Sequence, residues 1–139
     1  MTLTAPPNEV PKILVVSGDS FSDQLIEYAL KMAQRLDFEI ITLNVNETIV
    51  SLDQAEQERA RAAFYETARE ATRLFTERGE AWNVSVTSVI DINEAQKAIK
   101  ALEKQEPGIR YILSEPDPKR KKGANRQSPN PAFNLVTSG

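Results

Sequence analysis

Residues 12–45, KILVVSGDSFSDQLIEYALKMAQRLDFEIITLNV, decide the fold of this chain. The stretch opens with an aliphatic, β-branched run at 12–17 and closes with a second such run at 38–45. Uninterrupted apolar runs of this length are typical of strands buried on both faces, as in a parallel sheet. Between them, apolar residues recur at helical spacing over 22–36, and a serine followed by Asp23 suits a helix start. The stretch therefore predicts a strand, a helix and a second strand.

The same alternation continues towards the C-terminus. Residues 53–78 are rich in alanine, glutamate and arginine and predict a long helix that Gly79 would end. Residues 82–90 alternate apolar and polar side chains, which indicates a strand nearer the sheet edge. The other expected elements are a helix opened by a capping box of Asp91 and Glu94 and stopped by Pro107-Gly108, a strand at 109–114, and a short last strand at 132–136. This order predicts a parallel sheet covered on both faces.

Composition limits the chemistry that such a domain can perform. The 139 residues contain no cysteine and no histidine, are 40% hydrophobic and carry a net charge of −3. This excludes thiol nucleophiles, Ser-His-Asp triads and zinc sites built from histidine or cysteine. The length fits one domain at 11–139, preceded by a flexible tail at 1–10. Because we find neither a signal peptide nor a membrane-length apolar run, we expect a cytoplasmic protein with no membrane insertion.

Topology indicates where a ligand site would lie. In an open α/β sheet, ligands bind outside the carboxyl ends of the strands, where the strand order reverses. That edge would hold the turn Gly18-Asp19-Ser20, Val45 after the second strand and Ser114 after the fourth. Free N–H groups at a helix start attract anions, so the turn could hold a phosphate or a ribose. The same residues equally suit a tight turn and a helix cap.

Acidic residues are expected at the same edge. These are Asp19, Glu47, Asp91, Glu115 and Asp117. Two of them could share a Mg²⁺ ion with a nucleotide, or all could be loop and cap residues. The five glycines are too sparse for a P-loop or a GxGxxG motif, and no nucleophile–base pair stands out.

Residues 115–131 predict a basic, proline-rich loop. The basic residues of the last part of the chain all lie between Lys119 and Arg126, whereas the rest of the chain is acidic overall. The group that includes Lys119, Lys121 and Lys122 could meet a polyphosphate or another anionic partner. A solvated loop without a ligand is the alternative. Because no aromatic residue interrupts the basic run, the pattern argues against binding of single-stranded nucleic acid.

Together, these segments resemble the universal stress proteins. The first strand ends in a short turn of Gly, Asp and Ser, an amphipathic helix with alanine-rich spacing follows, and Thr42-Leu43-Asn44-Val45 takes the place of the family's second strand end. The resemblance covers roughly residues 11–114 and returns at the last strand. It implies a three-layer α/β/α fold of the adenine-nucleotide alpha-hydrolase-like kind, with a five-stranded, mostly parallel sheet in the order 3-2-1-4-5. It also implies homodimers and, in one branch of the family, binding of ATP or AMP.

The chain departs from the family pattern at two points. Gly18 stands at the commonly acidic position of the first turn, and Asp19 stands at the next. The glycine-rich phosphate-binding stretch after the fourth strand is replaced by Ser114-Glu115-Pro116-Asp117-Pro118, and the fourth helix is expected to be missing. Proline lacks the backbone N–H that a phosphate-binding loop supplies. These departures count against nucleotide binding.

We therefore expect a regulatory or interaction module of the universal-stress-protein kind, which is not an enzyme and needs no cofactor. It would form a homodimer through an edge strand with Phe133, Asn134, Leu135 and Val136, or another protein would cover the exposed flank of the sheet. Two alternatives stay open. One is an ATP- or AMP-binding stress-response switch with slow or no hydrolysis, in which the nucleotide would contact Gly18, Asp19, Ser20, Val45, Ser114, Lys119, Lys121 and Lys122. The other is binding of an anionic partner by residues 119–126 alone.

Overall fold

The structure is a computed structural model that describes residues 10–115 and 134–137. Its elements are β1 (Lys12–Ser17), α1 (Asp23–Leu36), β2 (Glu39–Val45), the 3₁₀ turn η2 (Ile49–Ser51), α2 (Gln54–Ala81), β3 (Val86–Asp91), α3 (Ala95–Gln105), β4 (Ile109–Ser114) and β5 (Asn134–Thr137). The expected N-terminal tail, the basic loop and the missing fourth helix fall wholly or almost wholly outside the described residues.

The strands form one five-stranded sheet in the order β3-β2-β1-β4-β5, as the resemblance to the universal stress proteins implied. β1 lies parallel to β2 and β4, and β2 lies parallel to β3. β5 runs antiparallel to β4, so the sheet is mostly parallel. Because Ser114 pairs with Asn134, the chain leaves β4 and enters β5 at the same edge of the sheet.

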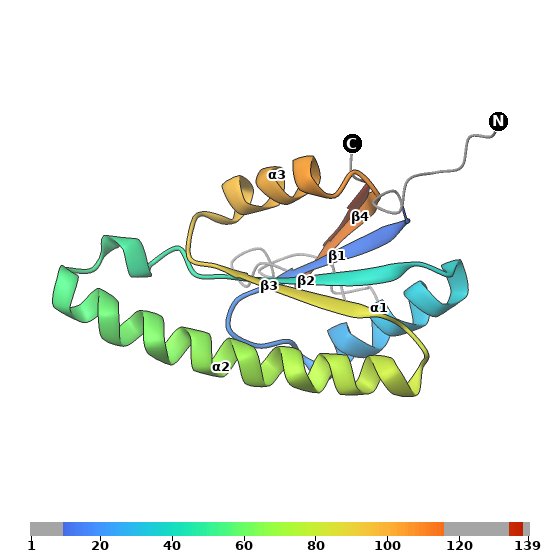
Figure 1. Cartoon of the computed structure of the whole chain (residues 1–139), viewed down its shortest axis with the longest axis horizontal. Coiled ribbons are helices and arrows are strands. Elements are labelled where there is room, and N and C mark those ends of the chain that lie inside the picture. The colour runs from blue at the N-terminus through green and yellow to red at the C-terminus, as the bar shows by residue number, and fades with distance from the viewer. Residues whose placement is uncertain (1–9, 116–133, 138–139) are drawn as a thin grey trace, which may run out of the picture.

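Helices cover both faces of the sheet and give three layers: α1 and α2 lie on one side and α3 on the other (Figure 1). Ile13 and Val15 of β1 join the core beneath α1 and α2. Leu14 and Val16 join the core beneath α3. Successive residues of β1 thus enter opposite cores, which explains why its sequence is apolar throughout. None of the described helices combines the length and the hydropathy that a membrane-spanning segment requires.

The predicted end of the long helix is wrong. α2 continues to Ala81, and Gly79 lies buried inside its last turn. A Cβ atom on Gly79 would lie 2.7 Å from Cγ2 of Val86 and 2.9 Å from the carbonyl oxygen of Val84. The glycine therefore lets the helix approach β3 closely. The left-handed residue of the following turn is Asn83, with φ of 63°, so the strand expected from residue 82 begins only at Val86.

The capping box expected at Asp91 and Glu94 is also wrong. Glu94 occupies the N-cap position of α3 without a side-chain capping bond. The Asp91 carboxylate instead accepts a hydrogen bond from the backbone N–H of Asn93 at 2.9 Å, which closes a local turn. The N–H of Ala95 donates to Oε2 of Glu47 at 3.0 Å. The cap of α3 thus comes from the segment that follows β2, where no local sequence pattern would reveal it.

Two side-chain oxygens of β2 are buried without a hydrogen-bond partner among the described residues: Oγ1 of Thr42 and Oδ1 of Asn44. A buried hydroxyl that makes no hydrogen bond costs roughly 1 to 3 kcal/mol of desolvation. Thr42→Val, which replaces the hydroxyl by a methyl group of similar size, should therefore raise the free energy of unfolding by about 1 kcal/mol. Urea denaturation of the purified variant measures this change.

Thr72→Val is the matched control for this prediction. Thr72 is also buried, but its hydroxyl donates to the carbonyl oxygen of Arg69 at 3.0 Å. At Thr72 the exchange removes a hydroxyl that already makes a hydrogen bond, so it should not raise the free energy of unfolding. A loss of stability in Thr42→Val would mean that the Thr42 hydroxyl has a partner in solution, and would contradict the expectation.

Candidate functional site

The carboxyl ends of β1, β2 and β4 lie side by side at one edge of the sheet. Ser17 at the end of β1 pairs with Asn44 of β2, and Val16 pairs with Ser114 of β4. Val45 and Ser114, both half-buried, end their strands at this edge. The exposed turn Gly18-Asp19-Ser20 follows β1 directly. The structure therefore brings together the five described residues that the sequence proposed for nucleotide binding.

The remaining residues of that proposal, Lys119, Lys121 and Lys122, lie outside the described residues. The same is true of Asp117 among the carboxylates expected at this edge. Of the other carboxylates, Asp19 is exposed in the turn and Asp91 closes the turn before α3. Within the described ranges, no group of three or more acidic residues is placed to hold a metal ion.

Hydrogen bonds hold the turn after β1 in place. The Asn44 amide donates to the carbonyl oxygen of Gly18 at 2.7 Å, and the Ser17 hydroxyl donates to the carbonyl oxygen of Ser20 at 2.6 Å. Ser22, the N-cap of α1, accepts a bond from the N–H of Leu25 through its hydroxyl at 3.1 Å. A Cβ atom on Gly18 would meet nothing within 4 Å, so crowding does not require glycine there.

Two of the predicted edge carboxylates cap helices from a distance. Oε2 of Glu115 accepts a hydrogen bond from the backbone N–H of Ser22 at 3.0 Å, where α1 starts. Oε2 of Glu47 accepts one from Ala95, where α3 starts. From the sequence, these two glutamates could have been Mg²⁺ ligands or helix caps. The structure shows both of them as helix caps. Their partners could not be predicted, because they lie on other elements.

β5 forms one end of the sheet and carries exposed apolar side chains. Leu135 is 39% exposed and Val136 is 54% exposed. Leu135 pairs with Leu113, which belongs to the core beneath α1 and α2, and Val136 pairs with Ile112, which packs against the core beneath α3. The two exposed residues therefore lie on opposite faces. Of the other predicted interface residues, Asn134 pairs in β5 and Phe133 lies outside the described residues.

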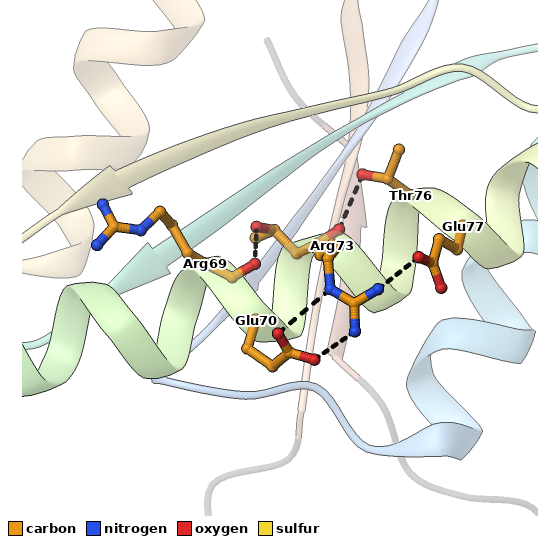
Figure 2. A network of polar contacts seen from close by, with 6 residues as sticks. Arg69, Glu70, Arg73, Thr76 and Glu77 are labelled. Carbon is orange, nitrogen blue, oxygen red and sulfur yellow. Dashed lines mark hydrogen bonds and ion pairs between the residues drawn. The ribbon is translucent and has the colours of Figure 1, made fainter.

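The sequence did not single out the polar network along the middle of α2 (Figure 2). Arg73 forms ion pairs with Glu70 and Glu77. Its hydrogen bond and positive charge lower the pKa of the Glu70 carboxyl below the usual range. The hydroxyls of Thr72 and Thr76 donate to backbone carbonyl oxygens one turn earlier. Because these pairs are exposed to solvent, we interpret the network as support for a long surface helix.

A groove of about 560 Å³ lies between α2 and the turn that precedes α1. It is lined by Ser20, Phe21, Ile26, Glu66, Thr67, Glu70, Ala71 and Leu74. No sequence signal marks it, because its two walls come from separate segments. Among its lining residues are two carboxylates but no nucleophile–base pair, so its composition does not point to catalysis.

Solved structures similar to this fold include two that are described as universal stress proteins. Universal stress protein UspA from Lactobacillus plantarum matches with a TM-score of 0.66 and 18% identity, over 86% of this chain and 84% of that chain. A universal stress protein family member from Burkholderia pseudomallei matches with a TM-score of 0.57 and 15% identity, over 72% and 77%. The hypothetical protein MJ0577, the subject of a structure-based assignment of function, matches with a TM-score of 0.55 and 21% identity, over 71% and 70%.

No protein-family model and no curated protein matches the sequence. The architecture is that of a three-layer α/β protein with the strand order 3-2-1-4-5. More particularly, the chain has the universal stress protein fold, which confirms the resemblance at the level of structure.

Proposed function

We propose that this chain is a divergent universal stress protein that acts as a regulatory or interaction module and works as a homodimer. Its fold supports a stress-protein-like role. The lack of cysteine and histidine favours a non-enzymatic role, as does the use of two edge carboxylates as helix caps. The module needs no cofactor.

The observation that carries this proposal is the edge strand β5. Within the described residues its one strand neighbour is β4, and it presents Leu135 and Val136 on opposite faces. A second copy related by a two-fold axis would place its own β5 alongside and continue the sheet. Pairing would bury apolar side chains on both faces and satisfy the backbone groups of the edge. A different protein that adds a strand at this edge is the alternative partner.

The ATP- or AMP-binding switch is the second candidate. One observation favours it: Gly18, Val45 and Ser114 lie at a common edge, where α/β folds bind ligands. The glutamates on the helix starts oppose it, because they occupy N–H groups that a phosphate would use. Binding of an anionic partner by residues 119–126 rests on sequence alone, since these residues lie outside the described part.

Sedimentation velocity tests the dimer. Val136→Lys and Leu135→Lys should each raise the dissociation constant of the dimer about a hundredfold, because a two-fold axis buries each new charge twice. Val50→Lys is the matched control: Val50 is 52% exposed, lies on η2 and should leave the dimer unchanged. A wild-type monomer at high micromolar concentration would reject the dimer. A dimer that survives both β5 variants would place the interface elsewhere.

A further inference from the structure

Glu47 and Glu115 make equivalent contacts after β2 and β4, the two strands on either side of β1. Glu47 follows β2 and caps α3, the helix that follows the adjacent strand β3. Glu115 follows β4 and contacts the start of α1, the helix that follows the adjacent strand β1. Each contact is a hydrogen bond of 3.0 Å from a backbone N–H to Oε2 of the glutamate. Both bonds lie at the carboxyl edge of the sheet.

These contacts place negative charge at the starts of α1 and α3. The start of a helix has backbone N–H groups without partners inside the helix and carries the positive end of the helix dipole. Phosphates bind to such N–H groups in many α/β folds. A carboxylate already in place satisfies one donor and repels a second anion. Because it is part of the chain, it competes at the effective concentration of a tethered group.

We propose that Glu47 and Glu115 are specificity-determining residues that exclude phosphate-bearing ligands from this edge. The inference rests on the proposed function, because it explains how a fold with a suitable edge would serve a module that does not bind nucleotides. Glu47 supplies the side-chain cap of α3, because the N-cap residue Glu94 contributes no side-chain bond. Glu115 is the glutamate that would exclude a phosphate from the turn at Gly18, which is part of the predicted nucleotide site.

Removal of Glu115 should open the edge without unfolding it. The Asn44 amide still holds the carbonyl of Gly18, and the Ser22 hydroxyl still caps the N–H of Leu25. Glu115→Ala therefore frees the N–H of Ser22 while the turn keeps its other hydrogen bonds. Glu47→Ala removes the side-chain cap of α3 and carries the greater risk of local fraying, so the single Glu115 variant serves if the double variant does not fold.

Isothermal titration calorimetry with inorganic pyrophosphate tests the proposal on the full-length chain. The double variant Glu47→Ala/Glu115→Ala should bind pyrophosphate about tenfold more tightly than wild type, and Glu115→Ala alone should show part of this gain. The control Glu58→Ala/Glu80→Ala removes the same charge from exposed positions of α2 and should change the affinity far less. An equal gain in the control would assign the effect to overall charge and overturn the proposal. No gain in either Glu115 variant would overturn it as well.

Amide NMR shows where the pyrophosphate binds. In the double variant, the ¹⁵N–¹H signals of Ser22 and Ala95 should shift on titration, because their N–H groups are the ones released. Shifts confined to residues 119–126 would place the anion on the basic run and overturn the proposal. The test compares the variant with wild type, so it is independent of whether wild type binds ATP. ATP binding by wild type would instead contradict the proposed function.

Discussion

Replacing Phe75 by alanine should lower the free energy of unfolding by about 3 to 5 kcal/mol, as measured by urea denaturation. Phe75 of α2 is fully buried in the core between the sheet and the two helices. Its ring meets that of Phe21 edge to face, with the ring centroids 5.2 Å apart. The truncation leaves a cavity that surrounding helices and strands fill only in part. It also removes the support of Phe21, which immediately precedes the N-cap Ser22.

Leu74→Ala is the control for the Phe75 prediction. Leu74 is the preceding residue of α2 but is 37% exposed. Its truncation should therefore lower the free energy of unfolding by less than about 1 kcal/mol. Equal losses in the two variants would mean that α2 is rotated relative to the sheet, and would contradict the packing described above.

Replacing Gly79 by alanine should lower the free energy of unfolding by about 1 to 3 kcal/mol, and by leucine more. At an open site inside a helix, the same exchange for alanine raises stability by up to about 1 kcal/mol. The sign reverses here because the new Cβ would lie 2.7 Å from a Val86 methyl group and 2.9 Å from the backbone oxygen of Val84. The helix would have to move away from β3, since the Val84 oxygen is backbone and cannot change rotamer.

Thermal and urea unfolding of Gly18→Ala provide the comparison. A Cβ atom on Gly18 meets nothing within 4 Å, so this exchange should change the free energy of unfolding by less than about 0.5 kcal/mol. A stabilised Gly79→Ala variant would show that the end of α2 does not pack against β3, and that the close contact at Val86 is absent in solution.

The parallel sheet with helices on both faces could be predicted because it depends on patterns that extend over whole elements. The strand order followed only from the resemblance to the universal stress proteins. The apolar run at 12–17 and the helical spacing at 22–36 agree with β1 and α1 to within one residue. The ends of helices and strands were harder to predict from the sequence. Gly79 suits a helix end by type, yet its role depends on Val84 and Val86, which return to it only when β3 joins the sheet.

The candidate site was predictable in place but not in detail. Topology alone brought Gly18, Val45 and Ser114 to one edge, and the register agrees. The contacts of Glu47 and Glu115 were not predictable, because their partners lie 48 and 93 residues away in sequence. The sequence predicted a mostly parallel sheet but not that β5 would be its antiparallel strand, since a short apolar segment fits a parallel or an antiparallel edge strand equally well.

Native mass spectrometry of the freshly purified, full-length wild-type protein tests the central proposal most directly, because it reports the number of subunits and any bound nucleotide together. We predict a species with twice the mass of one chain and no added mass of ATP or AMP. A monomer across the micromolar range, or a species that retains a nucleotide, would contradict the proposal of a homodimeric, nucleotide-free interaction module.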